Sequence, residues 1–432
     1  MAGVIGISSE ECCVRDLRCA MADLQHRAQD YCGMALFYNG NFSQHPERGL
    51  VKQQFNRARV KEFKGNSGIG VVANYRQPMY ELGKIGRIAL AVDGYLTNGD
   101  DVKKKMFERG AIFASRDGST EIRGEEIISK IIAGKKTFKE GIEGLTEAVD
   151  GDFALVGLTE EGVYAVRFGG KKPLVLGVRG NDFAVSSESN VFENIGFKLL
   201  RDVKPGEVIL LNKDGAQTIT ELRAYPAKYD SYEWVHNAHP ASVLEGNTVA
   251  VVRENIGRRL GERNKVEADI VSPIPNSGRC YASGFANSSG IVYREIFVKA
   301  YAGGRNASLE DPEDRAERAI TNLIPIREFI EGKRIILLED VVLHGIQTSL
   351  KVDILRKHGA KEVHLVVGSP PMKHFCGYRK NGFGGNLLAD SRSTEEIKEK
   401  LGLDSLSFAT VEDLEETIGM PREKLCFECW GV

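Results

Sequence analysis

The sequence predicts a protein that combines α/β and α+β architecture: a mixed sandwich of sheets and helices, followed by a parallel sheet. Short strand-like segments separated by tight turns run through the first half, which is typical of antiparallel strands between helical layers. In the second half, apolar strands alternate with amphipathic helices, as in a parallel sheet that is buried on both faces. The 432 residues are enough for two or three domains.

Composition indicates an ordinary globular protein with no nucleic acid or membrane partner. The chain is 42% hydrophobic and 27% charged, with a formal net charge of -2, so it carries no electrostatic signature of either surface. No stretch approaches the roughly 18 apolar residues of a membrane span, and the opening MAGVIGISSEECC lacks the basic region of a signal peptide. We expect a cytoplasmic protein whose eight cysteines are thiols or metal ligands.

The elements of the first half follow from local hydrophobic periodicity. Apolar runs bounded by Gly, Asp and Asn predict strands, and apolar residues spaced by three or four predict helices. We expect strands at 3–7, 33–38, 68–75 and 88–92, helices at 11–29, 96–110, 125–138 and 139–149, and further strands at 153–159, 162–168, 173–178, 183–186 and 207–212.

The most informative segment of the second half is KRIILLEDVVLHGIQTS, residues 333–349. Its branched apolar run predicts a buried strand, which ends in Glu339 and Asp340, turns around Gly345 and continues into a helix. Ligands of open α/β sheets lie beyond the carboxyl ends of the strands. Two carboxylates there can hold a divalent cation or accept hydrogen bonds from sugar hydroxyls, and a loop opening a helix offers N–H groups to phosphate. The pattern indicates a phosphorylated sugar, unless the acidic pair merely caps a helix or faces water.

A second strand–turn–helix lies upstream. The strand at 268–274 is followed by Pro275, Asn276, Ser277 and Gly278 and then by a helix of small residues. Clustered N–H donors in such a turn suit the pyrophosphate of an activated ribose. A further strand is expected at 291–298. Residues 302–312 are expected to form either a mobile lid or a solvated surface loop.

A series of segments in a fixed order resembles the glutamine phosphoribosylpyrophosphate amidotransferase (amidophosphoribosyltransferase) family. The segments are GDFALVGLTEEGVYAVRFGGKKPLVLG, AVSSES, RDVKPGEVILL, VSPIPNSG, EGKRIILLEDVVLHG and CFECWG. The resemblance implies a glutaminase-like αββα sandwich of the N-terminal nucleophile type at 1–225, a type I phosphoribosyltransferase-like sheet at 226–375, and a C-terminal segment at 376–432. It also implies a homodimer or homotetramer, and a place in purine nucleotide biosynthesis.

The glutaminase-like half departs from that family at its catalytic positions. Ala2 stands where the family has its N-terminal cysteine nucleophile, and Cys12 or Cys13 cannot take this role without removal of the first strand. Asp93 replaces the oxyanion-binding asparagine, and a carboxylate repels a developing oxyanion. The segments that hold the glutamine carboxylate and amine in the family, Arg-Tyr-Ser-Thr and Asp-Thr-Glu, correspond to Asn-Tyr-Arg-Gln at 74–77 and Ser-Thr-Glu at 119–121 here. The resemblance therefore predicts a catalytically inactive glutaminase domain.

The transferase-like half keeps the acidic pair but changes its phosphate loop. The family's two aspartates are Glu339 and Asp340, while the loop that follows loses its serine, arginine and threonines. By resemblance, Pro275, Ser277 and Gly278 would bind pyrophosphate, Lys299 and Arg305 would belong to the lid, and Gly345, His344 and Thr348 would remain for the 5-phosphate. Magnesium would lie among Ser277, Glu339 and Asp340.

Cysteines near the C-terminus predict a metal site. Cys376, Cys426 and Cys429 correspond to three cysteine ligands of the [4Fe–4S] cluster that many family members bind, and Asp230 stands at the fourth position. A zinc site that recruits Cys280, or buried thiols without a metal, are the alternatives.

Two functional hypotheses follow. In the first, both sites are degenerate, and the protein binds phosphoribosyl pyrophosphate, another sugar phosphate or a nucleotide, or regulates an active enzyme. In the second, it is an ammonia-dependent phosphoribosyltransferase that makes phosphoribosylamine or a related product.

Overall fold

The structure is a computed structural model that describes residues 1–113, 122–222, 227–299, 323–376 and 387–432. The chain divides into two compact units. Unit 1 comprises Met1–Tyr229 and Ala241–Gly246, and unit 2 comprises Asp230–Pro240 and Asn247–Val432. The division into parts at 225/226 and 375/376 stays a prediction.

Unit 1 is an αββα sandwich built on two antiparallel sheets. The seven-stranded sheet has the order β11-β9-β10-β1-β4-β2-β3, and the six-stranded sheet has the order β13-β12-β8-β7-β6-β5. The strands of the first sheet are β1 (Ala2–Ser8), β2 (Tyr31–Tyr38), β3 (Asn41–Arg48), β4 (Ser67–Ala73), β9 (Val175–Arg179), β10 (Asp182–Ser186) and β11 (Lys198–Asp202). Those of the second are β5 (Met79–Gly83), β6 (Gly86–Leu96), β7 (Gly151–Leu158), β8 (Val163–Phe168), β12 (Glu207–Asn212) and β13 (Gly215–Glu221).

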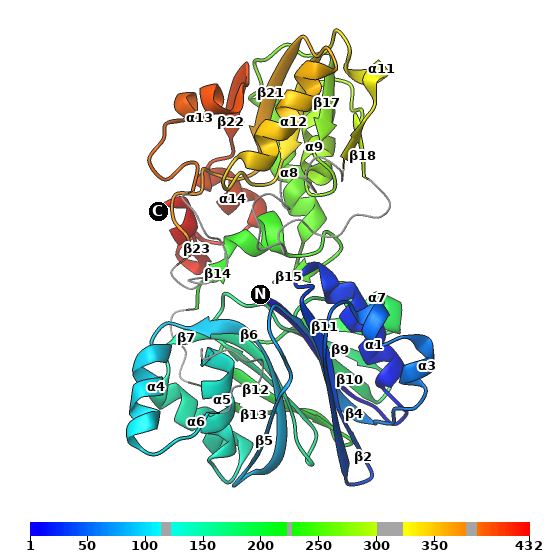
Figure 1. The fold of residues 1–432 in the computed structure, drawn as a ribbon, viewed down its shortest axis with the longest axis vertical. Helices are drawn as coiled ribbons and strands as arrows, with labels where there is room; N and C mark the ends of the chain where they lie inside the picture. The colour runs from blue at the N-terminus through cyan, green and yellow to red at the C-terminus, as the bar shows by residue number, and fades with distance from the viewer. Residues whose placement is uncertain (114–121, 223–226, 300–322, 377–386) are drawn as a thin grey trace. The chain divides into compact units, whose positions relative to one another are not determined.

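Helices cover the outer face of each sheet in unit 1 (Figure 1). The helices on the first sheet are α1 (Val14–Asp23), α2 (Val51–Gln54), α3 (Arg57–Val60) and α7 (Asn190–Ile195), and those on the second are α4 (Gly99–Glu108), α5 (Gly124–Ala133) and α6 (Phe138–Ala148). Strand β1 shows the alternation that this layering requires. Ala2 and Val4 face the core between the sheets, whereas Ile5 and Ile7 face α1.

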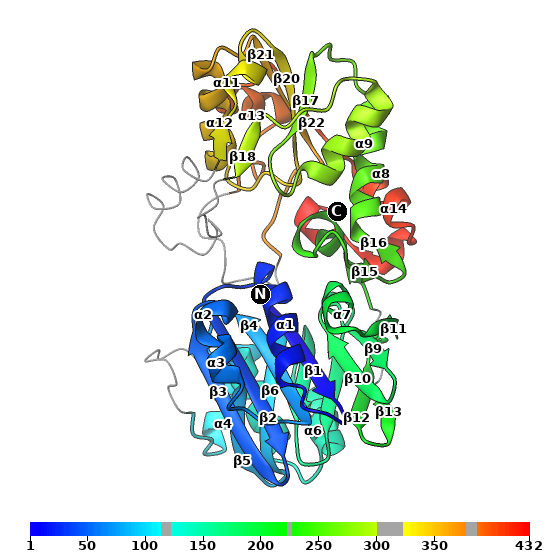
Figure 2. The ribbon, with the colours of Figure 1, turned by 90° about the vertical axis from the view of Figure 1, so that its right-hand side faces the viewer.

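Unit 2 contains a parallel sheet of order β17-β20-β21-β22. Its strands are β17 (Ile270–Pro273), β20 (Arg334–Glu339), β21 (Glu362–Val367) and β22 (Ser405–Phe408), and its larger helices are α8 (Val249–Glu262), α9 (Arg279–Ser289), α12 (Ile346–Lys357), α13 (Thr394–Leu401) and α14 (Val411–Ile418). Helices α12 and α13 lie on one side of the sheet, and α8 and α9 lie on the other (Figure 2). Shorter elements are β14 (Tyr229–Asp230), β15 (Val243–Leu244), β16 (Asn247–Thr248), β18 (Phe297–Lys299), β19 (Leu323–Pro325), α11 (Arg327–Ile330) and β23 (Leu425–Cys426).

The core of unit 2 explains why the segment after β20 is well placed for ligands. Ile335 and Leu337 of β20 pack with Val352 and Leu355 of α12, so the strand and its following helix are held together by their apolar faces. The carboxyl end of β20 therefore leads directly into the loop before α12. None of the helices in the described parts of the chain is long and apolar enough to span a bilayer.

Candidate functional site

Ala2 begins β1 and is completely buried. Its N–H donates to Asp93 Oδ1 at 2.9 Å, and its carbonyl accepts from Arg27 Nε at 2.8 Å. The side chain of Ala2 is only a methyl group, as expected of a position predicted to lack a nucleophile. The polar contacts described here are made by its backbone.

Around Ala2 lies a buried set of charges, which we call the N-terminal ion cluster: His26, Arg27, Asp93, Lys172 and Glu188. Arg27 bridges both carboxylates, with Nη1 2.7 Å from Glu188 Oε1 and Nη2 3.0 Å from Asp93 Oδ2. Lys172 Nζ is 3.7 Å from Asp93 Oδ1, and His26 Nε2 is 2.8 Å from Glu188 Oε1. The guanidinium of Arg27 is therefore fully committed to the protein's own groups.

The ion cluster keeps its two carboxylates ionised. Burial works to raise the pKa of Asp93, but Lys172 and Arg27 outweigh it and bring that pKa to about 2. The pKa of Glu188 is likewise held well below its usual value, because His26 and Arg27 overcome the effect of burial. At neutral pH the cluster is a network of compensated charges.

The two buried thiols of the glutaminase-like half, Cys13 and Cys32, are poor nucleophiles. The thiolate is the reactive form of cysteine, and burial raises the pKa of Cys32 to about 12 and that of Cys13 still further. Gln77, predicted within the altered carboxylate-binding segment, is buried and bonds both the N–H and the carbonyl of Val92. The predicted amine-binding segment, residues 119–121, lies outside the described residues.

The acidic pair of unit 2 lies at the carboxyl end of β20 and is buried, with Glu339 7% and Asp340 3% exposed. Ser277 Oγ donates to Glu339 Oε1 at 2.9 Å, and Lys351 Nζ is 3.3 Å from Glu339 Oε2. His236 Nδ1 is 2.6 Å from Asp340 Oδ2. The backbone N–H that follows the pair donates to Asp340 Oδ1 at 2.8 Å. Each of the four carboxylate oxygens thus has a donor within the protein.

The two acids differ in charge state. Burial raises the pKa of Glu339 to about 7, with Lys351 opposing this shift and Asp340 adding to it. Burial also acts to raise the pKa of Asp340, but His236 and Arg253 outweigh it and lower that pKa to about 2. Asp340 therefore carries the negative charge of the pair, and Glu339 titrates near neutral pH.

The structure brings together the two motifs that the sequence analysis singled out. The turn after β17 contains Pro275, Ser277 and Gly278, and Gly278 lies against the end of β20: a Cβ there would stand 2.2 Å from the Leu338 carbonyl oxygen. This close approach permits only glycine. It places the Ser277 hydroxyl on Glu339.

The predicted phosphate loop is shaped by Gly345 at the start of α12. Gly345 has φ +79°, and a Cβ there would stand 2.7 Å from Leu388, so glycine is needed for both reasons. His344 lies beside Phe375, with ring centroids 6.2 Å apart, and Thr348 is buried. Lys299 is exposed at the end of β18. Arg305 lies outside the described residues.

The segments that carry the predicted metal ligands meet in unit 2. Ser231, which follows Asp230, donates its hydroxyl to the Cys426 carbonyl at 2.8 Å. Backbone N–H groups of residues 373 and 374 donate to the Cys429 carbonyl at 2.9 and 3.2 Å. These contacts bring the chain near Cys376 to the C-terminal cysteines.

The side chains in these segments do not form a metal-binding geometry in the structure. Across the described ranges, no group of three or more His, Cys, Asp or Glu side chains is arranged to hold a metal ion. This statement covers Asp230, Cys376, Cys426 and Cys429, and also the pair Glu339 and Asp340. The predicted [4Fe–4S] and magnesium sites therefore stay predictions.

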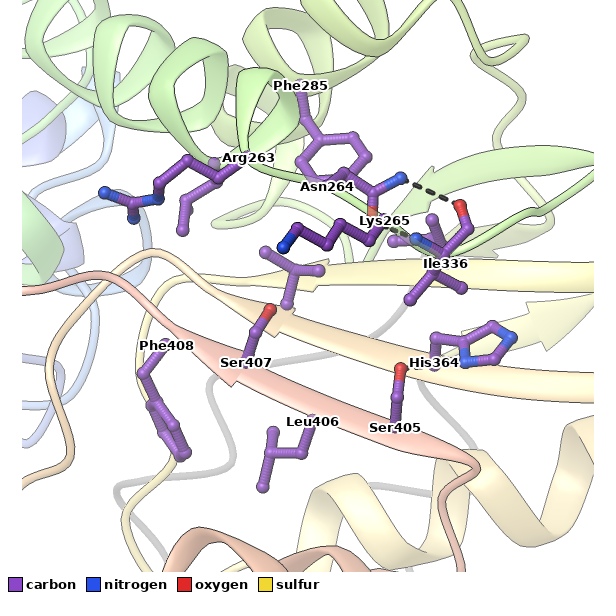
Figure 3. Close-up of a pocket in the computed structure, with 13 residues that line it drawn as sticks. Arg263, Asn264, Lys265, Phe285, Ile336, His364, Ser405, Leu406, Ser407 and Phe408 are labelled. Carbon is purple, nitrogen blue, oxygen red and sulfur yellow. Dashed lines mark hydrogen bonds between the residues drawn. The ribbon is translucent and has the colours of Figure 1, made fainter.

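A separate hollow of about 210 Å³ lies where the end of α8 and the loop after it meet the sheet (Figure 3). Lys265 extends into it, and Ser405 and Ser407 point toward the same side of β22. His364 lines it as well, with Nδ1 2.8 Å from Ser405 Oγ. The predicted site residues are not among those that line this hollow.

Sequence reasoning missed the cations of both sites. One local signal was available for Lys351: it shares a helical face with Thr348, Val352 and Leu355, all buried, so a lysine stands on the inward face of an amphipathic helix. His236 is far from its partner Asp340 in the sequence. Nothing local marked Arg27, whose carboxylate partners are distant in sequence.

Comparisons with known proteins agree across almost the whole chain. A family model described as a glutamine amidotransferase domain matches residues 67–194. An amidophosphoribosyltransferase of Methanothermobacter thermautotrophicus is 33% identical, covering 99% of this chain and 93% of the relative. One of Bacillus subtilis is 30% identical, covering 99% and 92%.

Solved structures give the same result. Glutamine phosphoribosylpyrophosphate amidotransferase from Bacillus subtilis, complexed with ADP and GMP, has a TM-score of 0.90 at 29% identity and covers 99% of this chain and 96% of its own. A structure described as the allosteric regulatory enzyme of purine biosynthesis also has a TM-score of 0.90, at 28% identity. The predicted family and fold class, a glutaminase-like αββα sandwich with a phosphoribosyltransferase-like sheet, are confirmed. The chain belongs to the amidophosphoribosyltransferase family.

Proposed function

We propose that this family member has no glutaminase activity and that its unit 2 binds a sugar phosphate or purine nucleotide in a regulatory role. The observation that carries the proposal is the surroundings of Ala2. Its backbone N–H is bonded to the Asp93 carboxylate, and Arg27 joins that carboxylate to Glu188.

Glutamine hydrolysis requires groups that this arrangement does not offer. A nucleophile must attack the amide carbon, and donors must stabilise the oxyanion that forms. Ala2 has no nucleophilic atom, and Asp93 is ionised and presents oxygens where donors are needed. The positive charge of Arg27 is already matched by two carboxylates, so it is not available to stabilise an oxyanion.

The ligand class rests on the turn and the acidic pair of unit 2. Ser277 and Glu339 lie together at the carboxyl ends of β17 and β20, where ligands of parallel sheets bind. The Bacillus subtilis relative of known structure is complexed with ADP and GMP, which favours purine nucleotides. We place this role in purine nucleotide metabolism in the cytoplasm. We also propose that the protein forms a homodimer or a homotetramer.

The acidic pair also supports a second candidate, ammonia-dependent phosphoribosyl transfer. Asp340 remains ionised at the place where a ribose would lie. Displacement at the anomeric carbon asks the protein mainly to orient the groups and exclude water. Ammonia itself would supply the nucleophile.

One assay separates these functions. The protein is incubated with magnesium, phosphoribosyl pyrophosphate and either glutamine or concentrated ammonia, and pyrophosphate release is followed; the Bacillus subtilis relative serves as the positive control. We expect no release with glutamine. Release with ammonia would establish the second candidate over the first.

Ligand binding is measured in parallel by thermal shift with ADP, GMP and phosphoribosyl pyrophosphate. We expect at least one of them to raise the melting temperature, because a ligand that binds the folded state stabilises it. No shift with any of the three, together with no turnover, would contradict both functions.

We also propose that the C-terminal cysteines bind a metal after a rearrangement that brings their side chains together. Soft thiolates select an iron–sulfur cluster or zinc. Iron, sulfide and zinc are assayed in anaerobically purified protein, with Cys426→Ser as the comparison. Iron with matching sulfide, lost in the variant, would support a cluster, zinc alone would support the zinc alternative, and neither metal would contradict the proposal.

A further inference from the structure

Lys351 is a buried lysine whose ammonium group faces the acidic pair. Its side chain is 8% exposed, and Nζ lies 3.3 Å from Glu339 Oε2. It reaches this position from the inward face of α12, among apolar residues of the core. Burying an ammonium group is unfavourable unless a negative group compensates it. The acidic pair, which Lys351 contacts through Glu339 and whose negative charge lies on Asp340, provides that compensation.

The acidic pair is satisfied without any added ion. Glu339 accepts from the Ser277 hydroxyl and faces Lys351, while Asp340 faces His236 and accepts from a backbone N–H. The four contacts come from the turn after β17, from α12, from residues 233–237 and from the loop after β20. Four separate segments of unit 2 therefore converge on the two carboxylates.

A divalent cation bound directly to Glu339 would share an oxygen with the Ser277 hydroxyl or with the Lys351 ammonium. Magnesium demands oxygen ligands at roughly 2.0–2.1 Å in near-octahedral geometry. An ion on Glu339 would lose the oxygen that Lys351 holds, or would lie beside that ammonium with like charges opposed. The donor set around Glu339 thus matches a lysine and does not match a metal ion.

We propose that Lys351 is the resident cation of the acidic pair, and that this site takes its sugar-phosphate ligand without a divalent metal ion. The statement about the sugar-phosphate ligand rests on the proposed function. The role of Lys351 as the cation of the acidic pair does not. Magnesium, which the sequence analysis placed among Ser277, Glu339 and Asp340, is replaced here by a side chain of the protein itself. Lys351 acts through Glu339 and is a specificity-determining residue of the site.

The first experiment measures Mn²⁺ binding, as a probe for Mg²⁺, by electron paramagnetic resonance on the full chain without any nucleotide. Wild type is compared with the double variant Lys351→Met/Glu339→Gln, which removes both partners and leaves no uncompensated charge between them. We expect equal binding. A saturable Mn²⁺ site that is present in the wild type and absent from the double variant would overturn the proposal.

The second comparison uses Lys351→Met, with Lys357→Met, an exposed lysine of the same helix, as the matched control. We expect Lys351→Met to gain Mn²⁺ affinity by at least tenfold and to lose the gain when Glu339→Gln is added, while Lys357→Met behaves as wild type. If Lys351→Met does not fold, Lys351→Gln replaces it. A folded variant that binds Mn²⁺ no better than wild type would contradict the role of Lys351.

The statement that the ligand binds without a divalent metal ion is tested by titrating the protein with the best ligand of the thermal-shift screen. The titration is done once in excess EDTA and once with magnesium. We expect the two dissociation constants to agree within twofold. A tenfold or greater dependence on magnesium would overturn this statement. Failure of every ligand would contradict the proposed function and with it this statement, but would leave the Mn²⁺ result intact, since that measurement contains no ligand.

Discussion

Each unit has a pair of buried carboxylates at its candidate site, but the cations around the two pairs differ. In unit 1, Asp93 and Glu188 share Arg27, Lys172 adds further positive charge, and His26 Nε2 lies 2.8 Å from Glu188. In unit 2, Glu339 and Asp340 are adjacent in the chain and face one lysine and one histidine. The first arrangement separates its acids with a guanidinium, whereas the second places them side by side.

This difference appears in the pKa values. Asp93 and Glu188 both have lowered pKa values, while the pKa of Glu339 rises to about 7 beside an ionised Asp340. A buried carboxyl group with a raised pKa is a candidate functional group, although unit 1 has one as well, because burial raises the pKa of Asp152 to about 6. This difference supports the proposals that unit 1 has no glutaminase activity and that unit 2 binds a ligand.

The largest loss of stability is expected from Arg27→Met. Arg27 is fully buried, and its loss leaves two ionised carboxylates without their shared partner, which costs about 3–5 kcal/mol of unfolding free energy. Chemical denaturation measures this change. Arg87→Met is the control, because Arg87 pairs with Glu160 at an exposed position and should cost no more than about 1 kcal/mol. Equal costs for the two variants would refute a structural role for the cluster.

The next largest effect is the pH dependence of stability that comes from Glu339. The folded-state pKa of Glu339, about 7, exceeds the ordinary value of 4.5 for a glutamate, so the folded protein binds the extra proton between these values and loses stability as pH rises through that window. Glu339→Gln lacks this loss. We expect its stability relative to wild type to improve by about 1–3 kcal/mol between pH 5 and pH 8.

Asp93→Asn provides the contrast. The pKa of Asp93 is lowered from 3.8 to about 2, so its contribution is present above pH 3.8 and is lost only as pH falls through the folded-state value. Between pH 5 and pH 8 the difference between Asp93→Asn and wild type should therefore stay constant. A pH-dependent difference for Asp93→Asn, or a constant one for Glu339→Gln, would reverse our assignment of the two sites.

A smaller loss of stability is expected from Lys351→Met than from Arg27→Met. Glu339 can escape the loss of its partner by taking up a proton, since its pKa already lies near neutrality. We expect a cost of about 1–2 kcal/mol at pH 7, measured by chemical denaturation. A cost equal to that of Arg27→Met would show that Glu339 stays ionised, contrary to its assigned pKa.

Local patterns were sufficient to predict much of the fold. The predicted strand within residues 333–349 is β20, and the helix after Gly345 is α12, because a buried strand followed by an amphipathic helix has a clear periodicity. Strand β3 was missed. Its residues, NFSQHPER, are polar and include a proline, which is tolerated because β3 is at the edge of its sheet.

The sites were predicted only in part, because their cations are distant in sequence. Glu339 and Asp340 could be found from their place after a strand. Arg27 and Glu188, however, are 161 positions apart, and His236 and Asp340 are 104 apart. The expected helix at 11–29 contains Arg27, but α1 ends at Asp23. The turn beyond it directs Arg27 inward, which no local pattern could have shown.

The proposal that the glutaminase-like half is inactive is tested most directly by glutamine hydrolysis. Glutamate release is measured with glutamine, phosphoribosyl pyrophosphate and magnesium present, alongside the Bacillus subtilis relative. Because Ala2 has no nucleophile and Asp93 replaces an oxyanion donor, we predict no release above that of a heat-denatured sample. Glutamate release that saturates with glutamine and is lost on denaturation would contradict this account.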